Sequence, residues 1–293
     1  MTTAARTLTR GGQLPVERHI IRERLRRNWL GLLAASLLAV FVLVGAAAPL
    51  LTPYDPLVMS PKQAFAPPSW SHLFGTDEFG RDLLSRAVYG TRISVGTAAV
   101  VVVVAVAIGA PLGLMAGYFG GAVDTVIMRL VDTILAFPAI LLAMGLIAVL
   151  GQGAVNGMIA VIIVSIPAFA RLVRASTLQQ KEMEYVEASR VIGASHLRIM
   201  LRTVLPNCLA PLLVQVAINA TWAVLLEAAL SFLGLGVQPP TPSWGQMLNV
   251  SRNYLYRAPW YGLFPGVFLT MLVLSLNTVS DWLQKIMSHG KIR

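Results

Sequence analysis

The chain has 293 residues, of which 56% are hydrophobic and only 12% are charged. Its apolar residues form runs of about twenty, which is the length that a helix needs to cross the hydrocarbon core of a bilayer. This composition excludes a soluble domain. The runs are also too long for the roughly ten-residue alternating strands of an outer-membrane barrel. We therefore predict an all-α membrane protein.

The net charge of +10 does not indicate a nucleic-acid partner. The basic residues lie between apolar runs and do not form one soluble face with interleaved aromatic residues. Such placement is typical of the positive-inside rule, which concentrates Lys and Arg in cytoplasmic loops. We expect this chain to contact membrane lipid and not nucleic acid.

The first apolar run, residues 28–51, follows a tail rich in arginine. Apolar residues recur at helical spacing in this tail, which is typical of a helix in the membrane interface and equally of a stop-transfer anchor. Ala46-Ala47-Ala48 resembles a signal-peptide cleavage site, but the run is longer than a signal core and Pro49 follows the would-be cut. We expect residues 1–27 to form a cytoplasmic tail with an interfacial helix, and residues 28–51 to remain as the first transmembrane helix.

Six transmembrane helices are predicted from the apolar runs. They cover about residues 28–51, 93–118, 128–150, 157–178, 208–235 and 259–286. Six spans place both termini on one side, and 17 of the Lys and Arg residues lie on that side against 6 on the other. We therefore expect cytoplasmic termini, including residues 288–293, and a cytoplasmic loop between the fourth and fifth helices.

Two external segments are too long for simple turns and are rich in proline and polar residues, namely residues 52–92 and 236–258. We expect a partner surface there. Prolines also interrupt the spans and permit kinks where a neighbour satisfies the freed carbonyl. They are Pro111, Pro138, Pro167, Pro211 and Pro265.

No catalytic motif accompanies these helices. A phosphate-binding Gly-x-x-x-x-Gly-Lys-Ser/Thr sequence is absent, and neither a His-Glu-x-x-His helix nor a cysteine pair marks a metal site. No Gly-x-Ser-x-Gly nucleophile elbow occurs beside a base. The one cysteine, Cys208, is expected to pack in the bundle. We expect no enzymatic activity, no metal and no cofactor bound by this chain.

The most informative polar segment lies between the fourth and fifth spans. Glu184 and Glu187 occupy a charged helical turn, Gly193 can end that helix with φ > 0, and a second short helix can begin at Ser195. Pro206 is expected to begin the next membrane helix. The pattern predicts a helix–turn–helix knob that contacts a soluble partner, with an ordinary amphipathic loop as the alternative.

The spacing within this segment is specific. Glu187-Ala188-Ser189, three residues, Gly193, nine residues, Thr203, one residue and Leu205-Pro206 resembles the coupling loop of ABC importer permeases. Ser189 replaces an alanine of that pattern and Thr203 replaces an isoleucine. The resemblance implies an ATPase-coupling loop at about residues 179–206. Its contact residues would be Glu184, Tyr185, Glu187, Ala188, Ser189, Gly193, Ala194, Leu205 and Pro206.

Motifs elsewhere narrow the family. They include Gly75-Thr76-Asp77, Gly80-Arg81-Asp82, Ser85-Arg86, Gly90-Thr91-Arg92-Ile93-Ser94, Phe137-Pro138, the run from Glu227 to Gly236, and Pro242-Ser243-Trp244-Gly245. Over roughly residues 20–287 the chain resembles dipeptide, oligopeptide and nickel permeases of the DppC/OppC type. The resemblance implies a permease core at residues 93–287 and a location in the plasma (inner) membrane of a prokaryote.

The same resemblance implies a heteromeric transporter. Its other subunits would be a second homologous permease, two cytoplasmic ATPases that bind ATP and Mg, and an external solute-binding protein. The chain would form half of a pathway for short peptides. A nickel or other small-solute importer is the alternative within the family. An autonomous channel or ion-coupled carrier, or a structural scaffold, is the alternative outside it; a carrier should show paired interrupted helices and buried charged relays.

Ionisable groups inside the membrane are candidates for function by default. Glu227, about two turns before the external end of the fifth span, is a candidate for the pathway or outer gate together with Ser231. The alternative is a structural Glu that is hydrogen-bonded to neighbouring helices. Asp132 is expected to pair with Arg129, one helical turn earlier.

Overall fold

The computed structural model describes residues 29–288, and every regular element in this range is a helix. Five helices there are long and apolar enough to cross a membrane, and a bent pair brings the number to six if the pair is one span. The predicted all-helical membrane bundle is confirmed. The predicted interfacial helix in residues 1–27 and nearly all of the C-terminal tail lie outside the described residues.

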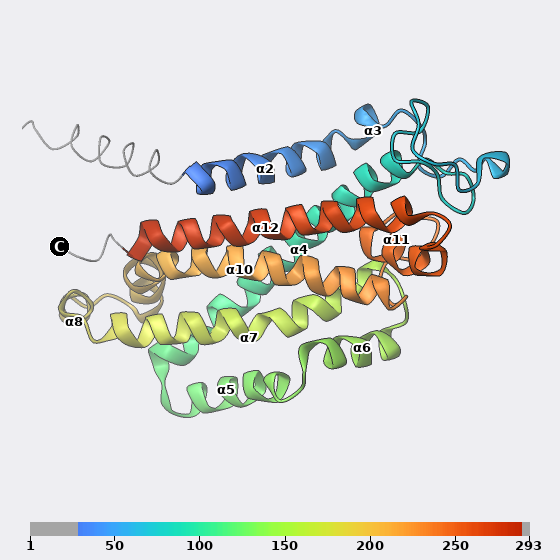
Figure 1. Cartoon of the computed structure of the whole chain (residues 1–293). Coiled ribbons are helices and arrows are strands. Elements are labelled where there is room, and N and C mark those ends of the chain that lie inside the picture. Colours follow the sequence, from blue (N-terminus) through green and yellow to red (C-terminus); the bar gives the residue numbers. More distant parts are fainter. Residues whose placement is uncertain (1–28, 289–293) are drawn as a thin grey trace, which may run out of the picture.

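The long helices run side by side, and the connecting segments gather at the two ends of the bundle (Figure 1). The spans are α2 (Trp29–Ala46), α4 (Leu83–Phe119), α7 (Ala154–Lys181), α10 (Leu205–Phe232) and α12 (Pro259–Ser288), with the pair α5 (Gly121–Leu135) and α6 (Ala139–Leu150). One end carries α8 (Glu184–Val191), the start of α2 and the end of α12. The other end carries α3 (Ala48–Leu51), η1 (Pro61–Gln63), α11 (Trp244–Ser251) and η3 (Arg252–Tyr254).

Helices α4 and α7 form the centre of the bundle and pack more extensively than any other pair, while α10 contacts both. Three glycines four residues apart, Gly109, Gly113 and Gly117, lie along one face of α4. A Cβ on Gly113 would lie 2.2 Å from the carbonyl oxygen of Ala170 on α7. The two backbones are therefore in direct contact, as small residues at four-residue spacing permit in membrane helices.

The second span begins ten residues earlier than predicted, at Leu83. Asp82 caps it, since its carboxylate accepts the backbone N–H of Ser85 at 2.8 Å. Hydropathy placed the boundary after Arg86 and Arg92 because charged residues are costly in a span. Arg86, however, is buried and paired with an acidic residue, so the helix continues through it.

The third span is not the single helix predicted for residues 128–150. It consists of α5 and α6, which are bent by 91° relative to each other. Pro138 lies at this bend and has no N–H to continue the helix, so the ladder of hydrogen bonds stops there. Gly120 and Gly121 have φ of +68° and +52°, which allows the chain to turn tightly from α4 into α5. Helix α5 therefore starts seven residues before the predicted boundary.

The fifth span also differs from the prediction. Pro206 lies in the first turn of α10, as expected, but α10 is not a separate helix. It continues α9 (His196–Ile199) through a π-helical turn, η2 (Met200–Val204), so one helix runs from His196 to Phe232. In the wider π turn the N–H of Leu205 bonds the carbonyl of Met200. The knob is thus continuous with a membrane span.

Candidate functional site

The knob, residues 184–199, has the predicted helix–turn–helix geometry. Helix α8 ends at Val191, and Gly193 in the turn that follows has a φ of +78°. The N–H of Gly193 bonds the carbonyl of Arg190 at 2.9 Å, and the N–H of Ala194 bonds that of Ser189 at 3.1 Å. These two bonds form a Schellman motif, which satisfies the last carbonyls of a helix. The Ser195 hydroxyl then accepts the N–H of Arg198 and caps α9.

The outer face of the knob combines acidic and apolar side chains. Glu184 and Glu187 are exposed in the first turn of α8. Val191 and Ile192 are each 82% exposed and Leu197 is also exposed, which forms an apolar tip at the turn. Exposed apolar groups of this kind mark contact surfaces for another protein. Sequence reasoning missed these three residues, although apolar residues on both sides of a glycine turn in a polar loop are a usable signal.

The inner face attaches the knob to the bundle. Val186 is buried in a cluster that includes Tyr118 of α4 and Val204. The hydroxyl of Tyr118 lies 2.9 Å from Nδ1 of His196, and the guanidinium of Arg190 lies 5.9 Å from the centre of the Tyr118 ring. Tyr118 is a further residue that sequence reasoning missed, since its partner lies 78 residues away in the chain. The knob is therefore held directly by the end of α4.

The remaining predicted coupling residues divide into two groups. The hydroxyl of Tyr185 donates to Gln180, and that of Ser189 donates to the carbonyl of Tyr185 at 2.8 Å. Partial burial raises the pKa of the Tyr185 phenol above its ordinary value. Leu205 packs against the buried cluster and Pro206 is exposed on the following helix. Residues 184–194 therefore share the knob, whereas Leu205 and Pro206 do not.

Glu227 is buried in a hydrogen-bonded network near the other end of α10. It accepts the hydroxyl of Ser231 at 2.9 Å and that of Ser94 on α4 at 3.4 Å. Ser231 in turn accepts the backbone N–H of Val237 at 3.1 Å. The hollow beside Glu227 measures about 10 Å³, which is the volume that one water molecule needs. Glu227 therefore joins α4, α10 and the following loop, and the hollow beside it is too small for a peptide.

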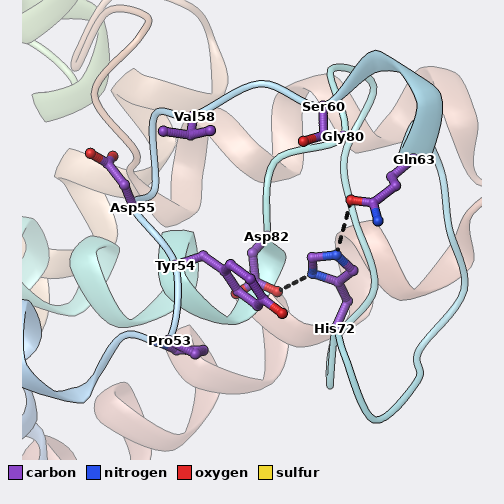
Figure 2. Close-up of a pocket in the computed structure, with 9 residues that line it drawn as sticks. All are labelled: Pro53, Tyr54, Asp55, Val58, Ser60, Gln63, His72, Gly80 and Asp82. Carbon is purple, nitrogen blue, oxygen red and sulfur yellow. Dashed lines mark hydrogen bonds and ion pairs between the residues drawn. The ribbon is translucent and has the colours of Figure 1, made fainter.

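Residues 53–86 form a polar cap at the end of the bundle opposite the knob (Figure 1), and Figure 2 shows a pocket within it. His72 lies between Asp82 and Gln63, with Nδ1 3.0 Å from the carboxylate of Asp82 and Nε2 3.3 Å from the side-chain amide of Gln63. The Tyr54 ring lies against the His72 ring, 4.9 Å from centre to centre. These residues line a hollow of about 340 Å³. Because Asp82 also caps α4, the cap is bonded to the start of that helix.

A buried ion cluster in this cap accounts for the charged residues of the motifs between residues 75 and 86. Asp77 accepts Nε of Arg81 at 2.6 Å and lies 3.4 Å from Nε of Arg86. Arg86 also donates to the carbonyl of Pro56 at 3.0 Å. A buried arginine needs such partners, because an unpaired buried charge is strongly destabilising.

Two ion pairs join α5 to α7. Asp124 accepts two bonds from Arg174, at 2.5 and 2.6 Å. Asp132 accepts one bond from Arg171 at 2.6 Å. The predicted pairing of Asp132 with Arg129 is therefore wrong. The neighbouring helix offers a guanidinium that local spacing along α5 could not reveal.

Comparison with known proteins places the chain in a family. The family of binding-protein-dependent transport system inner membrane components matches residues 109–293, and the N-terminal TM domain of oligopeptide transport permease C matches residues 18–68. The dipeptide transport system permease protein DppC of Haemophilus influenzae is 40% identical over 88% of this chain and 90% of its own length. The chain belongs to this permease family. It is a DppC/OppC-type ABC permease.

Other relatives and solved structures agree with this assignment. The di/tripeptide transport system permease protein DppC of Pseudomonas aeruginosa is 46% identical to this permease over 87% of the chain and 86% of its own length. The glutathione transport system permease protein GsiD of Escherichia coli is 41% identical, over 96% and 93%. A chain of the inward-facing MetNI methionine ABC transporter has a TM-score of 0.56 at 21% identity, covering 71% of this chain and 97% of that chain. The last likeness shows the fold alone.

Proposed function

We propose that this permease is a subunit of an ATP-driven importer of dipeptides and oligopeptides. It forms half of the translocation pathway together with a second, homologous permease. Two cytoplasmic ATPases bind ATP and Mg and contact the knob, and an external solute-binding protein delivers peptide to the opposite face. The chain itself has no enzymatic activity and binds no cofactor.

The observation that carries this proposal is the knob. It presents acidic and apolar groups outward, while its inner face is fixed to α4 by Val186, Tyr118 and His196. A rigid element with an exposed apolar tip suits force transfer from a partner, since two packed bodies can move together only if their contact is stable. The names of the relatives support peptides as the transported class.

The proposal includes an orientation in the inner membrane. The pair α5 and α6 counts as one span, which makes six spans and puts both termini on the side of the knob. That side is the cytoplasm, because most Lys and Arg residues lie there. The polar cap then faces the external solute-binding protein.

Site-directed cross-linking tests the partner and the orientation together. The chain has one cysteine, Cys208, so a Cys208→Ala background is free of other thiols. In that background we expect Glu187→Cys to cross-link to an ATPase subunit and never to the external binding protein. Lys62→Cys, in the cap, is the matched control with the opposite expectation. Cross-linking of Glu187→Cys to the external protein would refute the orientation, and a chain that purifies without ATPases would refute the function.

Uptake measurements test the substrate. Cells that lack this chain should lose uptake of dipeptides and tripeptides and regain it with the wild-type gene. Glutathione belongs in the panel because some relatives carry its name and it is itself a tripeptide. Unchanged uptake of every peptide after deletion would contradict the peptide assignment, and loss of nickel uptake alone would favour the small-solute alternative.

A further inference from the structure

The hollow in the polar cap carries acidic and neutral groups. Asp55 and Asp82 contribute carboxylates, and the other polar side chains that line it are those of Tyr54, Ser60, Gln63 and His72. None of the lining residues within 29–288 is a lysine or arginine. The hollow measures about 340 Å³, which is within the range of small-ligand sites and far larger than one water molecule needs. Its charge therefore favours a cationic occupant.

Hydrogen bonds fix the floor of the hollow. One oxygen of Asp82 lies 3.0 Å from Nδ1 of His72, and the other accepts the backbone N–H and the hydroxyl of Ser85, both at 2.8 Å. The N–H of Tyr54 donates to the same hydroxyl at 3.3 Å, and the Tyr54 ring lies against His72. Figure 2 shows Tyr54, His72 and Asp82 side by side. A preformed site of this kind loses little conformational freedom when it binds a partner.

The groups nearer the rim are not used by the fold. Asp55 is exposed, and it accepts the N–H of Leu57 at 2.8 Å but forms no ion pair within residues 29–288. In the same range, the hydroxyls of Tyr54 and Ser60 form no hydrogen bond. The Tyr54 side chain is also exposed, so its ring can accept a cation. A lysine or arginine entering the hollow therefore meets a carboxylate, two hydroxyls and an aromatic ring.

The surroundings of the hollow indicate a protein partner. Leu57, Val58 and Met59 form an exposed apolar run beside it, and Trp70, close to His72 in the chain, is 98% exposed. Binding energy at protein interfaces is concentrated in anchors such as arginine that enter a pocket ringed by contacts which exclude water. The cap also extends beyond the ends of α7 and α10 (Figure 1), away from the long helices that lipid surrounds. Its neighbour is therefore a partner on the aqueous side.

We propose that the hollow receives a lysine or arginine side chain of the external solute-binding protein. The partner's cation pairs with Asp55 and lies against the Tyr54 ring, above the fixed carboxylate of Asp82. The apolar run at residues 57–59 shields this contact from water. The inference rests on the proposed importer function, which supplies the partner, and it adds the chemistry of the partner's anchor. Because Asp82 caps α4, the docked protein contacts the start of the helix whose other end holds the knob.

The affinity of the peptide-loaded binding protein for the transporter in nanodiscs tests the proposal. We expect Asp55→Asn to weaken binding about fivefold, because it removes one member of an ion pair and keeps the shape. Asp55→Lys should weaken it further by like-charge repulsion. Ser60→Leu should also weaken binding, since it fills the hollow without changing its charge. Lys62→Gln is the matched control and should not weaken binding, because Lys62 is exposed in the cap but does not line the hollow.

Salt dependence separates a lost ion pair from a disturbed cap. Added salt screens exposed charges, so it should weaken binding to the wild type more than binding to Asp55→Asn. A photo-reactive thiol reagent on Val58→Cys, in the Cys208→Ala background, identifies the neighbour of the hollow. We expect it to cross-link to the binding protein.

Three results would overturn the proposal. Unchanged affinity in Asp55→Asn or in Ser60→Leu, in a transporter that still binds the external protein and takes up peptide, would exclude this anchor while the importer function stands. A cross-link from Val58→Cys to the second permease or to lipid, and not to the binding protein, would give the hollow another occupant. A wild-type transporter that binds no external protein would refute the importer function as well.

Discussion

At Gly193 the backbone has a φ of +78°, and no atom lies within 4 Å of the place where a Cβ would be. A side chain at this position therefore meets no neighbour, and its whole cost is backbone strain. For an L-residue that cost is about 1–2 kcal/mol, and it is largest for β-branched residues. Asn tolerates the same conformation better than any β-branched residue does.

We expect Gly193→Val to uncouple transport while the chain still inserts and assembles. The strained turn shifts the knob relative to its contacts with Tyr118, which are made by His196 and Arg190. ATP hydrolysis should therefore proceed with reduced peptide uptake. Gly193→Asn is the matched control and should retain most of the uptake. The ratio of peptide taken up to ATP hydrolysed, measured in proteoliposomes, separates the two variants. An unchanged ratio in Gly193→Val would show that the turn geometry does not matter.

Glu227 allows a second test at the scale of one residue. Its two oxygens accept hydroxyl groups from Ser231 and Ser94, so Glu227→Ala leaves both donors unpaired in a buried place. Lost bonds of this kind cost about 1–3 kcal/mol. We expect Glu227→Ala to lower the melting temperature of the purified transporter and Glu227→Gln to preserve both stability and uptake. A selective loss of uptake in Glu227→Gln would instead assign the carboxylate to the pathway or gate.

At the scale of helices, the contact between α4 and α7 depends on the absence of side chains. Gly113 faces the carbonyl oxygen of Ala170, and Gly117 faces the side chain of Thr177. Gly96 belongs to the same α4, but a Cβ there would meet nothing within 4 Å. One helix therefore offers both a forbidden and a permitted position for the same substitution.

We expect Gly113→Ala to destabilise the permease and Gly96→Ala to be neutral or stabilising. At Gly113 the added Cβ would lie 2.2 Å from a backbone oxygen, so the helices must move apart. At Gly96 the gain in helix propensity is about 1 kcal/mol. Thermal unfolding in detergent measures both. Equal melting temperatures for the two variants would contradict the close packing of α4 on α7.

The described part of the molecule has a knob at one end and a polar cap at the other, and α4 reaches both. At the knob end, Tyr118 contacts His196 and Arg190. At the cap end, Asp82 contacts His72 and Ser85. If the knob acts through α4, weakening the Tyr118 contact should affect communication between the ends more than it affects assembly.

We expect Tyr118→Ala to keep both ATPases bound but to lose the stimulation of ATP hydrolysis by the peptide-loaded external binding protein. Tyr118→Phe removes only the hydroxyl bond, worth about 1 kcal/mol, and should reduce the stimulation partly. ATPase assays with and without the external protein give the ratio. Full stimulation in Tyr118→Ala would exclude this contact from the coupling route.

The sequence predicted those features that depend on local pattern. Apolar length gave the spans, and the spacing around Gly193 gave the turn of the knob, because both are set by residues close together in the chain. It did not predict the start of α4, because the charge of Arg86 is neutralised by Asp77 in the fold. It also did not predict the pairing of Asp132 with Arg171, because the partner lies 39 residues away on another helix. Such contacts depend on how helices pack, which hydropathy does not describe.

Helix α4 has 37 residues and a length of about 55 Å, and both of its ends are fixed. It therefore joins the polar cap to the knob as one continuous helix. Its internal proline, Pro111, could allow the helix to bend. Gly109 and Gly113, two residues to either side, bring this stretch into direct contact with the backbone of α7, which opposes bending. If a partner displaces the knob, we expect the displacement to reach the polar cap through α4, because close packing on α7 opposes bending near Pro111.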